Sequence, residues 1–170
     1  MTDLVPLLTQ SPAAVEALLD HAFGPDRHAR TAYKVRGRAA PIAALSFAAV
    51  EDGALIGTIQ CWPVELAGDN GIATPLVMIG PVAVTPARQQ GGIGRELMAA
   101  ALAAAAAERL DGALMLIGDP EYYGRFFGFT AEATGAWRLP GPVERRRLLA
   151  RGDAVPQRAG VLGPAVRVAA

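Results

Sequence analysis

The apolar residues of this chain change their spacing at a glycine-rich turn, and this change restricts the fold more than any other feature. Before the turn, the runs Ala54 to Trp62 and Thr74 to Val84 are apolar and bounded by turn residues, as strands are. After Gly92 the apolar residues recur at helical spacing. They are Ile93, Leu97, Met98, Ala101, Leu102, Ala105 and Leu110. A strand therefore passes through a glycine turn into a long helix, for which Gly112 is the expected stop.

Two hairpins are predicted ahead of this helix. Asp52-Gly53 between the apolar runs Leu45 to Val50 and Ala54 to Trp62 is a strong hairpin signal. Gly68 to Gly71 joins the second run to a third in the same way. Three antiparallel strands result. After the helix, Ala113 to Ile117 predicts a short strand that can pair parallel to the last strand of this meander.

The remaining segments predict helices before and after the meander. Ser11-Pro12 and Asp119-Pro120 each combine a capping side chain with a proline at the first helical position. The expected elements are a helix from Ser11-Pro12 to about Phe23, a short helix at Arg27 to Tyr33, a helix from Asp119-Pro120 to about Phe127, a solvated helix face at Glu144 to Arg151 and an apolar segment at Val161 to Val168. We expect one domain over residues 1–170, of α+β class. Its mixed sheet would combine an antiparallel meander and a parallel strand pair, with helices on both faces.

Composition excludes several classes of function. The 16 basic and 16 acidic residues balance, so no net charge attracts nucleic acid or an anionic membrane surface. The single cysteine, Cys61, excludes an internal disulfide and a multi-cysteine metal site. Met1 to Leu8 lacks the basic segment of a secretory leader, and the apolar stretch Leu97 to Ala107 is too short to cross a bilayer. These features predict a cytoplasmic protein without nucleic-acid or membrane partners.

The segment from Val84 to Gly94 carries the clearest chemical signal. It lies between a predicted strand and a predicted helix, where backbone N–H groups and the helix dipole converge and favour a bound anion. Gly92 and Gly94 have no Cβ, so a pyrophosphate can approach the backbone closely. Arg88 and Arg95 can add positive charge at the rim. A nucleotide-binding fold of the Rossmann type does not fit. The glycine spacing of that fold is absent, and the strands before the turn form an antiparallel meander.

These residues resemble the GNAT superfamily of N-acetyltransferases. Gln89, Gly92 and Gly94 match the family's acetyl-CoA pyrophosphate signature Q/R-x-x-G-x-G/A. Before it, Ile79 to Val84 is similar to the family's fourth strand, whose bulge exposes backbone groups to the pantetheine arm. After it, Gly118 to Phe129 resembles the family's tyrosine-to-Gly-Phe motif, especially in the YhbS-like branch. The resemblance covers Leu45 to Phe129.

The resemblance implies acetyl transfer from acetyl-CoA to a primary amine by direct attack, without a covalent enzyme intermediate and without a metal. Backbone groups around Val82 would stabilise the developing oxyanion. A tyrosine would protonate the departing thiolate. The family's spacing falls on Gly124, one residue after Tyr123, so Tyr122 stays an alternative to Tyr123. The cofactor-binding residues carried over are Val82, Ala83, Val84, Arg88, Gln89, Gln90, Gly91, Gly92, Ile93, Gly94 and Arg95.

Several alternatives stay open at this point. The same turn would serve a non-catalytic acyl-CoA-binding or regulatory module, or an acyltransferase that uses a longer acyl chain or a hydroxyl acceptor. Asp119 is expected to be a helix cap rather than a base, and Glu51 a surface or turn residue. A thiol mechanism at Cys61 is the weaker option. The acceptor, the general base and the oligomeric state, including a homodimer, are not fixed by the sequence.

Overall fold

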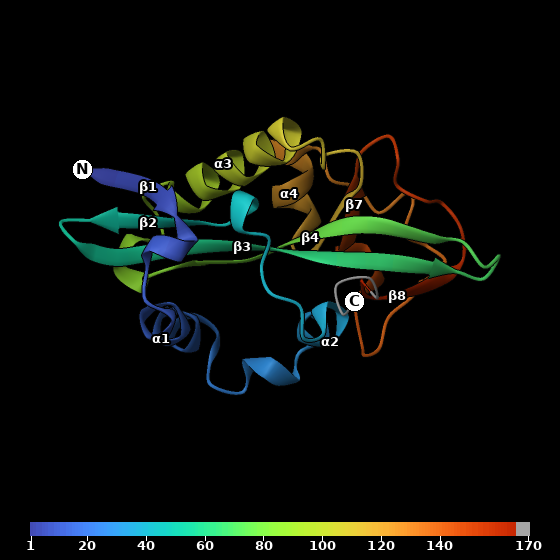
Figure 1. Cartoon of the computed structure of the whole chain (residues 1–170), viewed down its shortest axis with the longest axis horizontal. Coiled ribbons are helices and arrows are strands. Elements are labelled where there is room, and N and C mark those ends of the chain that lie inside the picture. The colour runs from blue at the N-terminus through green and yellow to red at the C-terminus, as the bar shows by residue number, and fades with distance from the viewer. Residues whose placement is uncertain (166–170) are drawn as a thin grey trace. The chain divides into compact units, whose positions relative to one another are not determined.

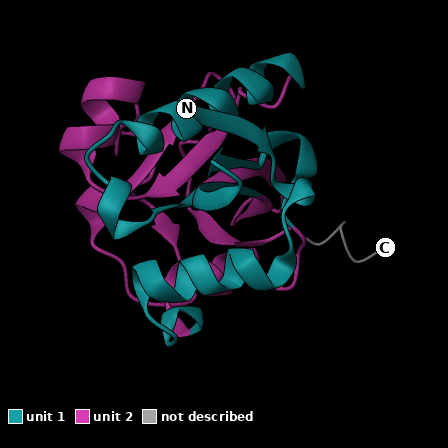
Figure 2. Ribbon diagram, turned by 90° about the vertical axis from the view of Figure 1, so that its left-hand side faces the viewer, with its two compact units in different colours: residues 1–28, 41–61, 80–108 teal, residues 29–40, 62–79, 109–170 magenta. Residues whose placement is uncertain are grey.

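A computed structural model describes residues 1–165, which divide into two compact units. Unit 1 comprises Met1–His28, Pro41–Cys61 and Gly80–Glu108, and unit 2 comprises Ala29–Ala40, Trp62–Ile79 and the chain from Arg109 onward. Figure 2 shows unit 1 in teal and unit 2 in magenta. Strands β3 and β4 each contribute residues to both units.

The strands form one mixed sheet within these residues. Its order is β1-β2-β3-β4-β5-β7, while β8 pairs with both β3 and β6. The strands are β1 (Thr2–Pro6), β2 (Phe47–Glu51), β3 (Ala54–Gly68), β4 (Ala73–Val84), β5 (Leu114–Ile117), β6 (Trp137–Arg138), β7 (Leu148–Arg151) and β8 (Gly160–Pro164). The helices are α1 (Pro12–Phe23), α2 (Thr31–Arg36), α3 (Ile93–Ala107) and α4 (Pro120–Phe127). The α+β class and the parallel β4–β5 pair predicted from the sequence are confirmed.

In unit 1, helix α1 covers one face of the strands. The Ser11 hydroxyl caps it by accepting a hydrogen bond from Ala14 N at 3.1 Å, and Gly24, with φ of +91°, ends it. Its apolar stripe packs on residues of the strands and of the first connection. This cluster consists of Leu7, Val15, Leu18, Leu19, Ala48 and Ala83. The predicted helix over this segment is confirmed at both ends.

Helix α3 covers the opposite face of the unit 1 strands (Figure 1). It approaches β3 closely because Gly57 has no side chain. A Cβ at Gly57 would lie 3.2 Å from both Ile93 Cγ2 and Leu97 Cδ1. The helix ends at Ala107, so the predicted stop at Gly112 is wrong.

The physical reason for this early end lies in the two residues that follow Ala107. Glu108 is the C-cap, and Arg109 takes a left-handed conformation with φ of +58°, which breaks the helical path without a glycine. Leu110 is 39% exposed, so it does not continue the apolar stripe that its spacing indicated.

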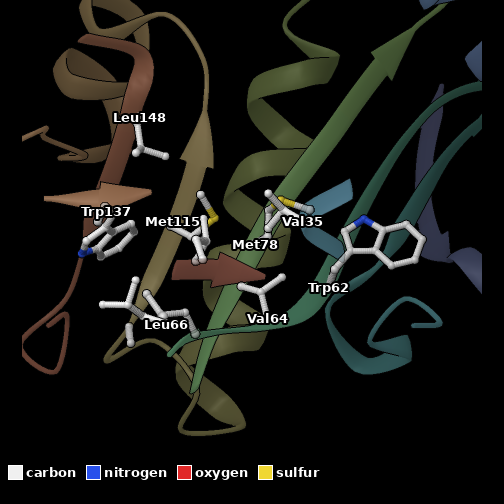
Figure 3. Close-up of a cluster of buried hydrophobic side chains, with 12 residues drawn as sticks. Val35, Trp62, Val64, Leu66, Met78, Met115, Trp137 and Leu148 are labelled. Atoms are coloured by element: carbon white, nitrogen blue, oxygen red, sulfur yellow. The ribbon is translucent and has the colours of Figure 1, made fainter. Parts of the chain in front are cut away.

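Unit 2 is built around a cluster of large buried side chains (Figure 3). Trp62, Met78, Met115, Trp137 and Leu148 are among its members, and each is at most 5% exposed. The indole N–H of Trp137 donates to Pro156 O at 3.1 Å, which satisfies its buried polar group. Strand β5 pairs parallel with β4 and antiparallel with β7, so the core lies along these central strands.

The hairpin predicted at Asp52-Gly53 is confirmed, since Glu51 pairs with Ala54. Strand β1, antiparallel to β2, was not predicted, because proline and leucine in its short run gave no alternation. The segment predicted as one short helix forms instead a 3₁₀ turn, Arg27–Ala29, followed by α2. Arg30 takes an extended conformation between the two, with ψ of 151°.

The predicted helix face at Glu144 to Arg151 is wrong. A 3₁₀ turn at Arg145–Arg147 leads into strand β7, whose residues Leu148, Leu149 and Ala150 are buried against β5. The apolar segment predicted at Val161 to Val168 overlaps β8, and its last three residues lie outside the described residues.

Candidate functional site

The turn between β4 and α3 is held by a chain of backbone hydrogen bonds. Thr85 N donates to Ile56 O of β3 at 2.9 Å, which fixes the end of β4. Arg88 N then donates to Thr85 O at 2.9 Å, and Gly91 N donates to Arg88 O at 3.2 Å. These bonds build the 3₁₀ turn Pro86–Arg88 and the bend after it. The turn is therefore an ordered part of unit 1.

The N-terminus of α3 opens onto this turn. Gly92 is its N-cap in a left-handed conformation, with φ of +81°, and no side chain caps the helix there. The first helical bond runs from Glu96 N to Gly92 O at 3.1 Å. The N–H groups of Ile93 and Gly94 come before this bond in the first turn, where such groups and the helix dipole favour an anion.

The glycines leave space at this point. A Cβ at Gly92 would meet no atom within 4 Å. At Gly94 a Cβ would meet only Val82 Cγ1 and Val84 Cγ2, both at 3.9 Å, which is ordinary contact. Packing within the protein therefore does not require glycine at Gly94. A group that approaches the helix end from outside would require it.

The polar side chains of the turn are partly engaged with the protein itself. Gln89 Nε2 donates to Val84 O at 3.3 Å and so closes the turn. Arg88 Nη1 forms an ion pair with Glu51 at the end of β2. Gln90 and Arg95 lie exposed on either side of Gly92. Sequence reasoning placed Arg88 at the site but missed Glu51, because nothing in the spacing links residues 51 and 88.

The last residues of β4 lead directly into the turn. Ala83 is buried, whereas Val82 and Val84 are partly exposed. Gly80 has φ of +113° and precedes a cis peptide bond to Pro81. The pairs between β4 and β5 lie before it, at Val77 and Met78. The positive φ of Gly80 interrupts the regular extended conformation of β4 shortly before the turn.

The two candidate tyrosines lie on α4, in unit 2. Asp119 caps this helix by accepting from Glu121 N at 3.0 Å, as predicted from the sequence. Hydrogen bonding, first to the side chain of Glu121, lowers the pKa of Asp119, which disfavours a role as a base. Burial raises the pKa of the Tyr123 hydroxyl, so this group stays protonated at neutral pH.

Tyr122 and Tyr123 differ in their surroundings. The ring of Tyr123 lies against Gly118, where a Cβ would come within 2.5 Å of its Cε2 atom. The ring of Tyr122 contacts Tyr123 edge-on, with 4.9 Å between the centroids, and lies 5.3 Å from the ring of the exposed Phe126. Tyr123 therefore packs against Gly118, whereas Tyr122 packs among the aromatic rings of α4.

Cys61 is fully buried, and burial raises the pKa of its thiol to about 12. A thiol with this pKa is almost entirely protonated at neutral pH and is a poor nucleophile. This argues against a mechanism through an acetylated cysteine. Within residues 1–165 there is no cluster of three or more His, Cys, Asp or Glu side chains that could bind a metal, and no helix long and apolar enough to cross a membrane.

Comparison with known proteins agrees with this fold. Residues 13–129 match the model of the acetyltransferase (GNAT) family, and the chain therefore belongs to the GNAT family of acetyltransferases. No curated protein matches it by sequence.

Solved structures share the fold. The GNAT family N-acetyltransferase YhbS from Escherichia coli, in complex with CoA, is 22% identical with a TM-score of 0.70 over 97% of this chain and 89% of its own. A GNAT family acetyltransferase from Brucella melitensis, in complex with acetyl-CoA, is 25% identical with a TM-score of 0.56 over 91% of this chain and 97% of its own. An aminoglycoside N-acetyltransferase, AAC(6')-Iy in complex with CoA, is 20% identical with a TM-score of 0.50 over 71% of this chain and 79% of its own.

Proposed function

We propose that this protein transfers the acetyl group of acetyl-CoA to a primary amine by direct attack, without a covalent enzyme intermediate. The observation that carries the proposal is the uncapped N-terminus of α3, at which Gly92 and Gly94 leave open space beside the first-turn N–H groups. Membership of the GNAT family supports it. Two of the similar structures are complexes with CoA and acetyl-CoA, respectively.

In this proposal the turn binds the pyrophosphate of acetyl-CoA. Backbone N–H groups of Gly92, Ile93 and Gly94 donate to it, the two glycines admit it, and Arg88 adds positive charge. Gln89 keeps the turn closed through Val84. Gln90 and Ile93 complete this segment, while Val82, Ala83 and Val84 border the thioester arm. Backbone N–H groups near Val82 stabilise the oxyanion that develops during attack.

The bound acetyl-CoA supplies an activated thioester. Two proton transfers accompany the reaction, one from the amine and one to the departing sulfur. An amine near the ordinary lysine pKa of about 10.4 must lose a proton to a base or a chain of water molecules before it attacks. The second proton goes to the sulfur as the carbon–sulfur bond breaks, and we assign its delivery to Tyr123. Its raised pKa keeps the hydroxyl protonated until the thiolate forms. Tyr122 is the alternative donor.

The high pKa of Cys61 favours direct attack over a thiol intermediate. The proposal leaves the amine unidentified, and it includes neither a metal nor a nucleic-acid or membrane partner. It describes an enzyme of the cytoplasm, one domain in size, with monomer and homodimer both compatible. The second candidate function is a non-catalytic acyl-CoA-binding module, which the same open helix end would serve.

Calorimetric titration with acetyl-CoA tests the proposal first. Binding should be accompanied by a higher thermal midpoint, because a ligand that binds only the folded state stabilises it. A panel of polyamines, aminoglycosides and peptide N-termini should then release CoA thiol from acetyl-CoA. Absence of binding at millimolar acetyl-CoA would refute both candidate functions. Binding without thiol release for any amine or hydroxyl acceptor would favour the non-catalytic module.

A further inference from the structure

Glu51 lies at the junction of three segments of unit 1. It ends β2, where it pairs with Ala54 across the hairpin and with Thr2 of β1. Its Oε2 atom accepts a hydrogen bond from the Thr2 hydroxyl at 3.0 Å, and its Oε1 atom forms the ion pair with Arg88. Both carboxylate oxygens are thus engaged, one by strand β1 and the other by the turn after β4.

The hydrogen bond from Arg88, followed by that from Thr2, lowers the pKa of Glu51, so its carboxylate stays charged at neutral pH. The side chain of Arg88 is 38% exposed and that of Glu51 is 21% exposed. Ion pairs at such exposure add little to folding stability, because water and salt screen them. The pair's main physical consequence is therefore to fix the position of a long, flexible side chain.

The contact leaves most of the Arg88 guanidinium available. An arginine has five N–H donors, and Arg88 uses Nη1 for Glu51. Within residues 1–165, its Nε and Nη2 atoms have no hydrogen-bond partner. The backbone of Arg88 lies in the turn that leads to the open end of α3.

We propose that Glu51 is a positioning residue for cofactor binding, which holds the Arg88 guanidinium so that its remaining N–H groups donate to a phosphate of CoA. This inference rests on the proposed function. Binding of CoA then requires less ordering of Arg88, since the side chain is already restricted before the ligand arrives. Phosphate in CoA occurs in the pyrophosphate and in the 3′-phosphate, and both have the chemistry that a guanidinium recognises.

The test is a double-mutant cycle on CoA binding, measured by calorimetry with Glu51→Gln, Arg88→Ala and the double variant. Glu51→Gln should raise the CoA Kd roughly 3- to 10-fold, the range expected for immobilising one long side chain. In the Arg88→Ala background the same change should have no further effect. Glu51→Asp, which keeps the charge, should bind between the parent and Glu51→Gln. With acetyl-CoA and a working acceptor, KM should rise while kcat stays near the parental value.

Asp52→Asn is the matched control. It removes the same charge from the next residue, which is exposed and forms no hydrogen bond or ion pair with Arg88, and asparagine tolerates its left-handed conformation with φ of +51°. Its CoA Kd should stay within about twofold of the parent, since an exposed charge without a partner is screened. Thermal denaturation of each unliganded variant checks that the fold is kept.

Repeating the cycle with dephospho-CoA identifies the phosphate. If the loss at Arg88→Ala persists, Arg88 contacts the pyrophosphate, and if it disappears, Arg88 contacts the 3′-phosphate. Tighter CoA binding by Glu51→Gln, or an equal loss with and without Arg88, would overturn the role of Glu51. A parent protein that binds neither CoA nor acetyl-CoA would instead refute the proposed function on which this role rests.

Discussion

The glycines of the β4–α3 turn and Gly118 before α4 differ in whether the packing of the protein explains the absence of a side chain. A Cβ at Gly118 would lie 2.5 Å from Tyr123 Cε2 and 3.2 Å from Leu116 Cδ1, so the protein's own packing excludes a side chain there. A Cβ at Gly94 would make only ordinary contacts at 3.9 Å. Packing explains the first glycine and leaves the second unexplained. The ligand that we propose to bind at the helix end would supply a reason for the second.

Helices α4 and α3 also differ in whether a side chain of the protein caps the first turn. The carboxylate of Asp119 caps α4 and satisfies a first-turn N–H group. Helix α3 starts at Gly92, which has no side chain to do so. An N-terminus that is satisfied internally has no need of an anion, whereas an open one favours an anion. This difference supports the proposed binding at the turn of unit 1 rather than at the start of α4.

The largest effect is expected for Gly94→Glu. The carboxylate would occupy the space that a pyrophosphate needs and would oppose its charge, so acetyl-CoA affinity should fall by at least about 100-fold, or about 2.7 kcal/mol. The fold should survive, because the Cβ position is open. Calorimetry gives the affinity, and circular dichroism gives the fold.

Gly135→Glu is the control for Gly94→Glu. It adds the same side chain in unit 2, at an exposed glycine whose Cβ would also meet nothing within 4 Å. It should bind acetyl-CoA like the parent. If Gly94→Glu also binds like the parent, the pyrophosphate does not lie at this helix end.

The next effect concerns α4. Tyr123→Phe should lower kcat about 10²- to 10⁴-fold, with little change in the acetyl-CoA KM, because it removes a proton donor and keeps the ring. Turnover of the parent should not decline on the alkaline side below pH about 10, since the pKa of Tyr123 lies above its ordinary value. Steady-state kinetics across pH, with an acceptor from the amine panel, measure both.

Tyr122→Phe is the internal control for Tyr123→Phe, and it should keep nearly parental turnover. The reverse result would move the proton donor to Tyr122. Parental turnover in both variants would leave the thiolate to be protonated by water and would limit the two tyrosines to packing.

The smallest effects come from alanine at three glycines, measured by urea unfolding. Gly118→Ala should destabilise by about 1–3 kcal/mol, because the ring of Tyr123 must move. Gly92→Ala should cost about 1–2 kcal/mol through its left-handed φ. Gly94→Ala should be neutral or stabilise by up to about 1 kcal/mol, since alanine favours a helix, and should still weaken acetyl-CoA binding.

If Gly94→Ala is more stable than the parent but binds acetyl-CoA more weakly, glycine at this position is required by the ligand and not by the fold. Equal losses of stability at Gly94 and Gly118 would remove the distinction between the two glycines. The loss of stability in Gly92→Ala measures the cost of backbone strain alone, because a Cβ at Gly92 would meet no atom within 4 Å.

Local signals explain the parts of the fold that the sequence predicted. Ser11-Pro12 and Asp119-Pro120 placed the starts of two helices, and Asp52-Gly53 placed a hairpin, because each depends on neighbouring residues alone. The turn from Val84 to Gly94 was located for the same reason. Its function as a cofactor site stays a prediction, as do the roles of the tyrosines.

What the sequence missed depends on contacts between distant residues. The sequence of strand β7 is typical of a basic helix face. In the structure this segment pairs with β5, and its leucines are buried. Helix α3 ends through the left-handed Arg109, which no residue preference announces. Glu51 resembles an ordinary turn residue until the fold brings Thr2 and Arg88 to its two oxygens. Tertiary structure decides all three cases.

The most direct test of the central claim is release of CoA thiol from acetyl-CoA in the presence of an amine panel, for the parent and Gly94→Glu side by side. At least one amine should give acceptor-dependent thiol release with the parent. The same amine should give none with Gly94→Glu at equal acetyl-CoA, while Gly135→Glu should match the parent. A parent that binds acetyl-CoA yet releases no thiol with any acceptor, or equal release by Gly94→Glu, would contradict this claim.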